Sequence, residues 1–330
     1  MKGLLIGVSL VLIVLALAGL RSGSAQQAGP AQQNANNGAP PLANPLKVAI
    51  LDWYKANKTT HFKVGKRPYD VAFDGANIWS ANYANHSVTK LRASDGKILG
   101  TFRVGQWPDA LAFDGANIWV GNFGEGGVTK LRASDGKKLG SFAAGEGPMA
   151  VRFDGENIWI ANGYSGTVTK LRARDGKNLG NFNTGGSPNG LAFDGTYIWV
   201  TGTGEGVTRL RKDGANAGTF KVGSIPIGAA FDGANIWIAN NSGASVSKLR
   251  ARDGVNLGTF SLGGELPWGV AFDGTNIWVT GTPDIVELRA SDGKMLDRFH
   301  YPYNSATTGI AFDGANIWVA ATYDNEVVKY

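Results

Sequence analysis

The residues best suited to proton transfer are the histidines, of which the sequence holds three: His61, His86 and His300. An imidazole gains and loses a proton near neutral pH, as a lyase or lactonase requires. His86 and His300, with Glu146 and Arg152, are therefore the candidates for an enzyme of this type. No nucleophile paired with histidine, zinc-ligand spacing or phosphate-binding loop accompanies them, and the absence of cysteine excludes thiol chemistry. We therefore favour a protein without catalytic residues and keep the enzyme as the alternative.

Arg152 is the most unusual charged residue, because it replaces a small apolar side chain in a repeated segment. The residues at the equivalent positions are Ala72, Ala112, Ala192, Ala230, Ala271 and Ala311. A charged group inside a protein must find partners or face water. Two roles fit Arg152: binding an anion or ligand, or forming a local ion pair with Glu146 or Glu156.

Aromatic residues outside the repeated motif are candidates for binding. Trp107 and Trp268 are the tryptophans of this kind in the repeat region, and several other aromatic residues share their end of the repeats: Tyr69, Phe123, Tyr164, Tyr301, Tyr303 and Tyr323. Such rings stack on sugars, bases or a protein partner. The alternative is that Trp107 and Trp268 only plug the mouth of a central channel.

Two carboxylates, Asp70 and Asp109, lie just after the prolines that precede the repeated segment. With Glu146 and Glu265 they are candidates for attracting a cation near the channel mouth. A metal site with oxygen ligands needs several converging groups, and the sequence shows no such convergence. We favour solvated or turn-stabilising carboxylates, and we predict no metal and no cofactor.

These residues are positioned by a repeat whose motif, Ala-Phe-Asp-Gly-Ala-Asn-Ile-Trp-Val, is complete at residues 112–120. The motif tryptophans are Trp79, Trp119, Trp159, Trp199, Trp237, Trp278 and Trp318, at intervals of 40, 40, 40, 38, 41 and 40 residues. A period of about 40 residues with strand-like patterning is typical of a β-propeller with one four-stranded blade per repeat. We expect these tryptophans to form the core and the motif aspartates to form turns.

The second repeat serves as a template for a blade. Its four predicted strands are residues 109–113, 117–121, 128–133 and 138–144. The Asp-Gly pairs at 114–115 and 135–136 separate apolar runs, as tight hairpin turns require. The chain ends within the third strand of the seventh repeat, and residues 61–65 match the outer strand at 101–105. We therefore predict an all-β, seven-bladed β-propeller, closed by an N-terminal strand that completes the last blade.

The motif above, the segment Val-Thr-Lys-Leu-Arg-Ala-Ser-Asp-Gly and the connection Val-Gly-x-x-Pro resemble bacterial seven-bladed propellers of the YVTN/NHL type. The resemblance covers about residues 60–330. It implies several functions, because this superfamily includes surface and envelope proteins, DNA-binding members and the streptogramin (virginiamycin B) lyases. The lyases use histidines and a glutamate at the channel mouth, and this sequence shows no equivalent pair of histidines.

Function is expected where the repeats differ from one another. The connections before each inner strand and the loops after each motif tryptophan vary, and strand alternation places both sets at one end of every blade. We call this end the variable face. Loops on a rigid scaffold commonly carry recognition. We therefore predict a binding scaffold that recognises an envelope or extracellular partner, protein or polysaccharide, through this face.

The N-terminal region predicts export. Residues 3–20 carry no charge, so residues 1–25 fit either a cleaved signal peptide or an uncleaved membrane anchor. Residues 26–44 fit a flexible spacer, residues 45–58 a short docking segment with the pattern of a helix, and residues 59–330 the propeller. The protein is then periplasmic, extracellular or tethered outside the cytoplasmic membrane, which it touches only through an uncleaved N-terminal segment.

The net charge of +6 admits a nucleic-acid partner, but the basic residues follow the repeat. The pair Lys90 and Arg92 recurs as Lys130 and Arg132, Lys170 and Arg172, Arg209 and Arg211, and Lys248 and Arg250. Charges spaced by one blade are spread round the perimeter rather than gathered in a patch. We expect solvated, partly ion-paired side chains, and nucleic acid is not the favoured partner.

Overall fold

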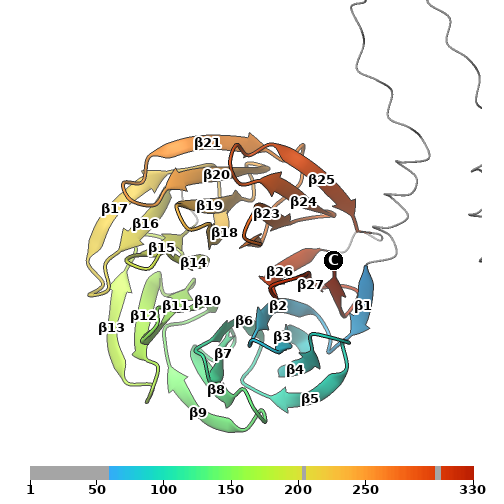
Figure 1. Ribbon diagram of the computed structural model, residues 1–330. Coiled ribbons are helices and arrows are strands. Elements are labelled where there is room, and N and C mark those ends of the chain that lie inside the picture. Colours follow the sequence, from blue (N-terminus) through green and yellow to red (C-terminus); the bar gives the residue numbers. More distant parts are fainter. Residues whose placement is uncertain (1–58, 203–205, 302–305) are drawn as a thin grey trace, which may run out of the picture. The chain divides into compact units, whose positions relative to one another are not determined.

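The computed structural model describes residues 59–202, 206–301 and 306–330, which form a ring of seven four-stranded antiparallel sheets (Figure 1). The predicted seven-bladed propeller is confirmed. The predictions for residues 1–58, and the tyrosine at 303, lie outside the described residues. Within the described ranges, no helix is long and apolar enough to cross a membrane.

In six blades four strands follow one another in sequence from the axis outward, and the last blade takes its outer strand, β1, from the other end of the described chain. The first four blades are β2 (Pro68–Phe73), β3 (Asn77–Asn82), β4 (Ser87–Arg92), β5 (Ile98–Arg103); β6 (Pro108–Phe113), β7 (Asn117–Asn122), β8 (Gly127–Arg132), β9 (Lys138–Ala143); β10 (Pro148–Phe153), β11 (Asn157–Asn162), β12 (Thr167–Arg172), β13 (Asn178–Asn183); and β14 (Gly190–Phe193), β15 (Ile198–Thr201), β16 (Gly206–Leu210), β17 (Asn216–Lys221). The others are β18 (Pro226–Phe231), β19 (Asn235–Asn240), β20 (Ser245–Arg250), β21 (Asn256–Ser261); β22 (Val270–Phe272), β23 (Asn276–Thr280), β24 (Asp284–Arg289), β25 (Met295–His300); and β26 (Thr307–Phe312), β27 (Ile317–Ala321), β28 (Glu326–Lys329), β1 (Thr60–Lys63). The strands predicted for the second repeat agree with β6 to β9 to within one residue.

A tryptophan–aspartate pair fixes the first hairpin of every blade. In the second blade, Trp119 Nε1 donates a hydrogen bond of 2.8 Å to Asp114, whose other carboxylate oxygen accepts the backbone N–H groups of Ala116 and Asn117. The same tryptophan–aspartate bond measures 2.7–2.8 Å in all seven blades. Gly115 has φ of 95°, which glycine adopts without strain. The repeated motif is therefore architectural, as predicted.

The core lies between neighbouring blades. Trp79 packs with Val88 of its own blade and with Leu111 and Ile118 of the next blade, and its side chain has no exposed area. Six of the seven motif tryptophans are fully buried, and Trp278 is partly buried. Burying faces of this size against both neighbours holds the ring together without disulfides.

The recurring basic pairs divide into two kinds, which corrects one expectation. The arginines are solvated and ion-paired as predicted, for example Arg92 with Asp95 at 3.0 Å. The prediction is wrong for the lysines: Lys90 is 6% exposed, its Nζ donates to the carbonyl of Ala133 in the next blade at 2.6 Å, and it lies over the Trp79 ring. The same bridge between blades recurs from Lys130, Lys170, Arg209, Lys248 and Lys329. A long side chain reaches the next blade, where a carbonyl and an aromatic face replace water around the charge.

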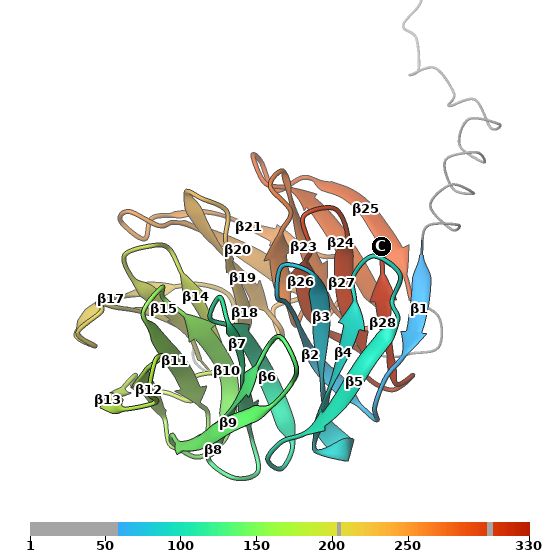
Figure 2. The same cartoon turned by 60° about the horizontal axis from the view of Figure 1, so that its bottom comes forward.

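The two ends of the described chain close the ring. β1 pairs with β28 in antiparallel register, from Thr60 opposite Lys329 to Lys63 opposite Glu326, and Figure 2 shows β1 beside β28. Glu326 accepts His61 Nδ1 at 2.9 Å and pairs with Lys63 Nζ at 2.9 Å. The predicted closure by an N-terminal strand is therefore confirmed, and an ion-paired carboxylate joins its two strands.

Replacing Glu326 with Gln is expected to lower the free energy of unfolding by about 1 kcal/mol at pH 7. Burial acts to raise the pKa of Glu326, but Lys63 and His61 outweigh it and hold the pKa below 4.5. A depressed pKa adds stability above the unfolded value, and this contribution is lost as pH falls. Urea unfolding should therefore show a loss at pH 7 that shrinks at pH 3. The exposed Glu146→Gln is the control, and an equal loss at both pH values would contradict the prediction.

Candidate functional site

The variable face is one end of the blades, as the register of the inner hairpins shows. In the first blade Pro68, at the start of β2, pairs with Asn82, at the end of β3. The connection into β2 and the loop after β3 therefore lie at the same edge. Asn82 also joins them directly, because its side-chain oxygen accepts the backbone N–H of Gly65 at 3.1 Å. The predicted shared end of the two variable sets is confirmed.

Six aromatic residues form a connected group on this face across four successive blades, together with Arg67. They are Tyr323 of the last blade, Tyr69 and Tyr83 of the first, Trp107 and Phe123 of the second, and Tyr164 of the third. We call this group the aromatic arc.

Ring contacts connect the arc from one blade to the next. Tyr83 lies in the short 3₁₀ helix η1 (Tyr83–Asn85), with its ring centroid 4.8 Å from that of Tyr69 and 6.0 Å from that of Trp107, on which it stacks. Phe123 meets Tyr164 edge to face at 4.9 Å. These spacings are typical of favourable aromatic pairs. The rings therefore form a continuous surface rather than isolated exposed residues.

Arg67 connects the aromatic residues of the first blade to Tyr323 of the last blade. Its guanidinium lies 5.9, 5.7 and 5.8 Å from the ring centroids of Tyr69, Tyr83 and Tyr323. At the two ends and the middle of the arc, Tyr323 is 61%, Tyr164 70% and Trp107 42% exposed. Large exposed aromatic surfaces of this kind mark interaction sites.

Asp70 and Asp109 lie beside the arc, on the innermost strands β2 and β6. Asp70 accepts the backbone N–H of Val71 at 2.9 Å and, across the blade boundary, that of Leu111 at 2.8 Å. Asp70 therefore joins the inner strands of two neighbouring blades. Burial raises the pKa of Asp70 to about 6 against the opposing effect of these hydrogen bonds.

Asp109 differs from Asp70 in having no hydrogen bond to any described residue. Burial, and after it the nearby Asp70 carboxylate, raises the pKa of Asp109 from 3.8 to about 8. Burial first, then the charge of Asp109, also raises the pKa of Tyr69 and Tyr83. At neutral pH the pair therefore offers one protonated and one ionised carboxyl group. Such a pair can donate to one ligand group and accept from another.

Arg152 lies on the inner strand β10 and does not form the predicted pair with Glu146 or Glu156. Its guanidinium donates to the carbonyl of Leu191 on β14, the inner strand of the next blade, at 3.1 and 3.2 Å. The side chain of Arg152 is exposed to solvent and lies among the inner strands. It therefore faces the axis of the ring. Enclosure lowers the pKa of Arg152, and the charge of Asp70 opposes this effect. The predicted ion pair with Glu146 or Glu156 is therefore wrong. The carboxylate whose charge acts on Arg152 is that of Asp70, which lies in another blade.

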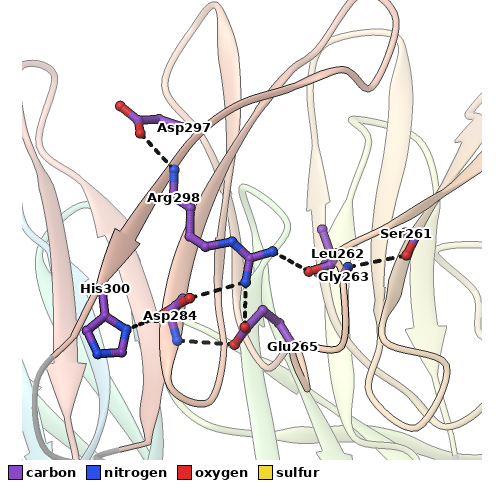
Figure 3. A network of polar contacts seen from close by, with 8 residues as sticks. All are labelled: Ser261, Leu262, Gly263, Glu265, Asp284, Asp297, Arg298 and His300. Carbon is purple, nitrogen blue, oxygen red and sulfur yellow. Dashed lines mark hydrogen bonds and ion pairs between the residues drawn. The ribbon is translucent and has the colours of Figure 1, made fainter. Parts of the chain in front are cut away.

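His86 and His300 are not brought together. His86 follows η1, and its Nδ1 accepts the backbone N–H of Trp107 at 3.1 Å. His300 ends β25 in the sixth blade, where its Nδ1 lies 2.7 Å from Asp284. Figure 3 shows that Asp284 also contacts Arg298, which pairs with Glu265 at 2.5 Å. Each histidine therefore belongs to its own local network, and the structure assembles no joint site for proton transfer.

Two predicted site residues lie on the variable face outside the aromatic arc. Trp268 precedes β22 in the sixth blade and is 36% exposed. Glu146 precedes β10, with an exposed side chain and its backbone N–H bonded to Ser165 Oγ. The ring contacts of the described residues do not include Trp268, and Glu146 does not join Asp70 and Asp109. Among the same residues, no group of three or more His, Cys, Asp or Glu side chains is arranged to hold a metal ion.

Arg67 and Tyr83 were missed at the level of sequence. Both lie in segments that vary between repeats, so their position was a usable signal. The sequence did not indicate that these residues lie close together, because Arg67 contacts Tyr323 only when the first and last blades meet.

No protein-family model and no curated protein matches the sequence. Solved structures do match. The virginiamycin B lyase of Staphylococcus aureus, as selenomethionine protein, has a TM-score of 0.72 and 17% identity, over 82% of this chain and 98% of that one. A catalytically inactive variant of that lyase with quinupristin gives 0.72 and 18%, with the same coverage. The WD40 propeller domain of Doa1 gives 0.72 and 12%, over 82% and 94% of the two chains.

These likenesses show the fold. A lyase and a WD40 domain match equally well by TM-score at low identity, so the fold does not select between a catalytic and a binding function. Membership of the YVTN/NHL repeat class stays a prediction. Function must be argued from the aromatic arc and the carboxyl pair.

Proposed function

We propose that the protein is an exported propeller that binds an envelope or extracellular polysaccharide through the aromatic arc. The observation that carries the proposal is the continuity of the arc over four blades, with three of its rings more than one-third exposed. A row of rings suits a ligand that repeats along its length. Flat aromatic faces pack against the apolar faces of sugar rings, while polar groups beside them bond the hydroxyl groups.

The carboxyl pair fits this role. Asp109, whose charge acts on Tyr69 and Tyr83, would donate to or accept from a sugar hydroxyl group that reached it beside these rings. A protein partner is the alternative ligand, and the same surface would serve it. Export enters the proposal from the uncharged residues 3–20, and cell fractionation that found the protein in the cytosol would remove that part.

The double replacement of Trp107 and Tyr164 with Ala is expected to weaken polysaccharide binding about 10- to 100-fold, because two stacking rings are lost. Both side chains are exposed, so the fold should be retained. The measurement is isothermal titration of a panel of soluble glycans and affinity electrophoresis in immobilised ones. Trp268→Ala is the matched control, since it removes an exposed tryptophan of the same face outside the arc. Full binding by the double variant, or an equal loss in the control, would contradict the arc as the site.

A further inference from the structure

A hollow with a volume of about 430 Å³ lies between β1, the closing strand, and the outer half of the first blade. Its lining includes Lys63 on one side and Ser87, Thr89, Thr101 and Arg103 on the other. The lining thus combines three hydroxyl groups and two cations with Val64, Gly65, Asn85 and Ile98.

The hydroxyl groups of the hollow have protons to donate. The buried amide of Asn82 donates to Ser87 Oγ at 3.2 Å and to Thr89 Oγ1 at 2.9 Å. Thr89 Oγ1 lies 3.3 Å from Thr101 Oγ1. Because Asn82 donates to the buried hydroxyl groups of Ser87 and Thr89, the proton of Thr89 can go to Thr101 Oγ1. The exposed hydroxyl group of Thr101 can then donate its own proton to an acceptor oxygen of a ligand.

The cations of the hollow are unlike those at the other blade boundaries. Arg103 is exposed and forms no ion pair with a described residue, whereas Lys63 pairs with Glu326 at 2.9 Å. The residues at the equivalent position of the other outer strands are Ala143, Asn183, Lys221, Ser261 and His300. Lys63 and Arg103 are the last residues of the outer strands of two neighbouring blades. Among the outer strands described, no other two neighbouring blades both have a lysine or arginine at this position. Arg103 adds a planar set of donors that suits a carboxylate or sulfate.

One connection links the hollow to the aromatic arc. Val64 and Gly65, which follow β1, line the hollow, and Arg67 two residues later reaches the rings of the arc. We propose that the hollow binds a carboxylate or sulfate group of an acidic polysaccharide whose sugar rings stack on the arc. This inference rests on the proposed function and specifies the charge of the ligand.

The test uses Arg103→Ala, because alanine stands at the equivalent position of β9 and the fold tolerates it there. Lys221→Ala removes one positive charge at the equivalent position of another blade and is the matched control. Titration is performed with paired glycans: oligogalacturonate and its neutral methyl ester, heparin and desulfated heparin. The wild-type protein should bind an acidic member more tightly than its neutral partner. Arg103→Ala should weaken that binding about 10-fold, with Lys221→Ala changing it less than 2-fold.

Several outcomes would overturn the inference. One is an unchanged preference for the acidic member in Arg103→Ala, and another is no binding of any acidic member by the wild-type protein. Sodium sulfate binding as tightly as the acidic glycans would make the hollow a site for free anions instead. Tighter binding of single-stranded DNA, with a steep salt dependence, would replace the glycan by nucleic acid. The proposed function is tested separately by the Trp107 and Tyr164 double variant. Loss of neutral glycan binding in that variant would support the arc as the binding site, whatever the result for Arg103→Ala.

Discussion

Replacing Trp159 with Ala is expected to lower the free energy of unfolding by about 3–5 kcal/mol, as for other large buried aromatic residues. Trp159 has no exposed area and packs against Leu191, Ile198 and Val200 of the next blade. Truncation removes this contact and leaves a cavity between two blades. The cost is high because each blade contacts only its two neighbours, so a gap on one side cannot be filled from elsewhere.

Two further variants separate the causes of this effect. Trp159→Phe keeps most of the packing but loses the Nε1–H bond of 2.8 Å to Asp154, and a loss of about 1–2 kcal/mol is expected. Tyr164→Ala, at an exposed position of the following loop, should change stability by less than about 0.5 kcal/mol. The measurement is urea unfolding followed by tryptophan fluorescence and circular dichroism. If Trp159→Ala cost no more than Tyr164→Ala, cores between blades would not hold the ring together.

Replacing Asp109 with Asn is expected to stabilise the protein at alkaline pH by several kcal/mol. The folded pKa of about 8 lies above the ordinary value of 3.8, so the folded protein holds a proton that the unfolded chain releases. Stability therefore falls as pH rises from about 4 to about 8 and is constant above that range. Asparagine resembles the protonated acid and removes this dependence.

The measurement is urea unfolding of both proteins at pH 5, 7 and 9. The advantage of Asp109→Asn should grow over this series. Carbon NMR of the carboxyl group reports the titration directly. In Asp70→Asn the titration of Asp109 should move to lower pH, because the neighbouring negative charge is gone. A difference in stability that stays constant between pH 5 and 9 would contradict the enclosure of Asp109 by the inner strands.

The sequence predicted what lies within a blade. Asp114, Gly115 and Trp119 act over a few residues, so their spacing alone indicated the turn, the hairpin and the buried ring. Repetition at about 40 residues then predicted the number of blades, and the match between residues 61–65 and 101–105 predicted how the ring closes. These features depend on local turn chemistry and strand alternation, which the order of residues determines.

Only the tertiary structure decided which residues of different blades meet. Lys90 lies inside a blade boundary because the carbonyl of Ala133 is within its reach, and nothing near Lys90 in the chain indicates that carbonyl. Arg152 bonds Leu191, and Asp70 bonds Leu111, because inner strands of neighbouring blades face one another round the axis. The physical reason is that each of these contacts joins residues about one repeat apart, so it exists only once two neighbouring blades have packed against each other.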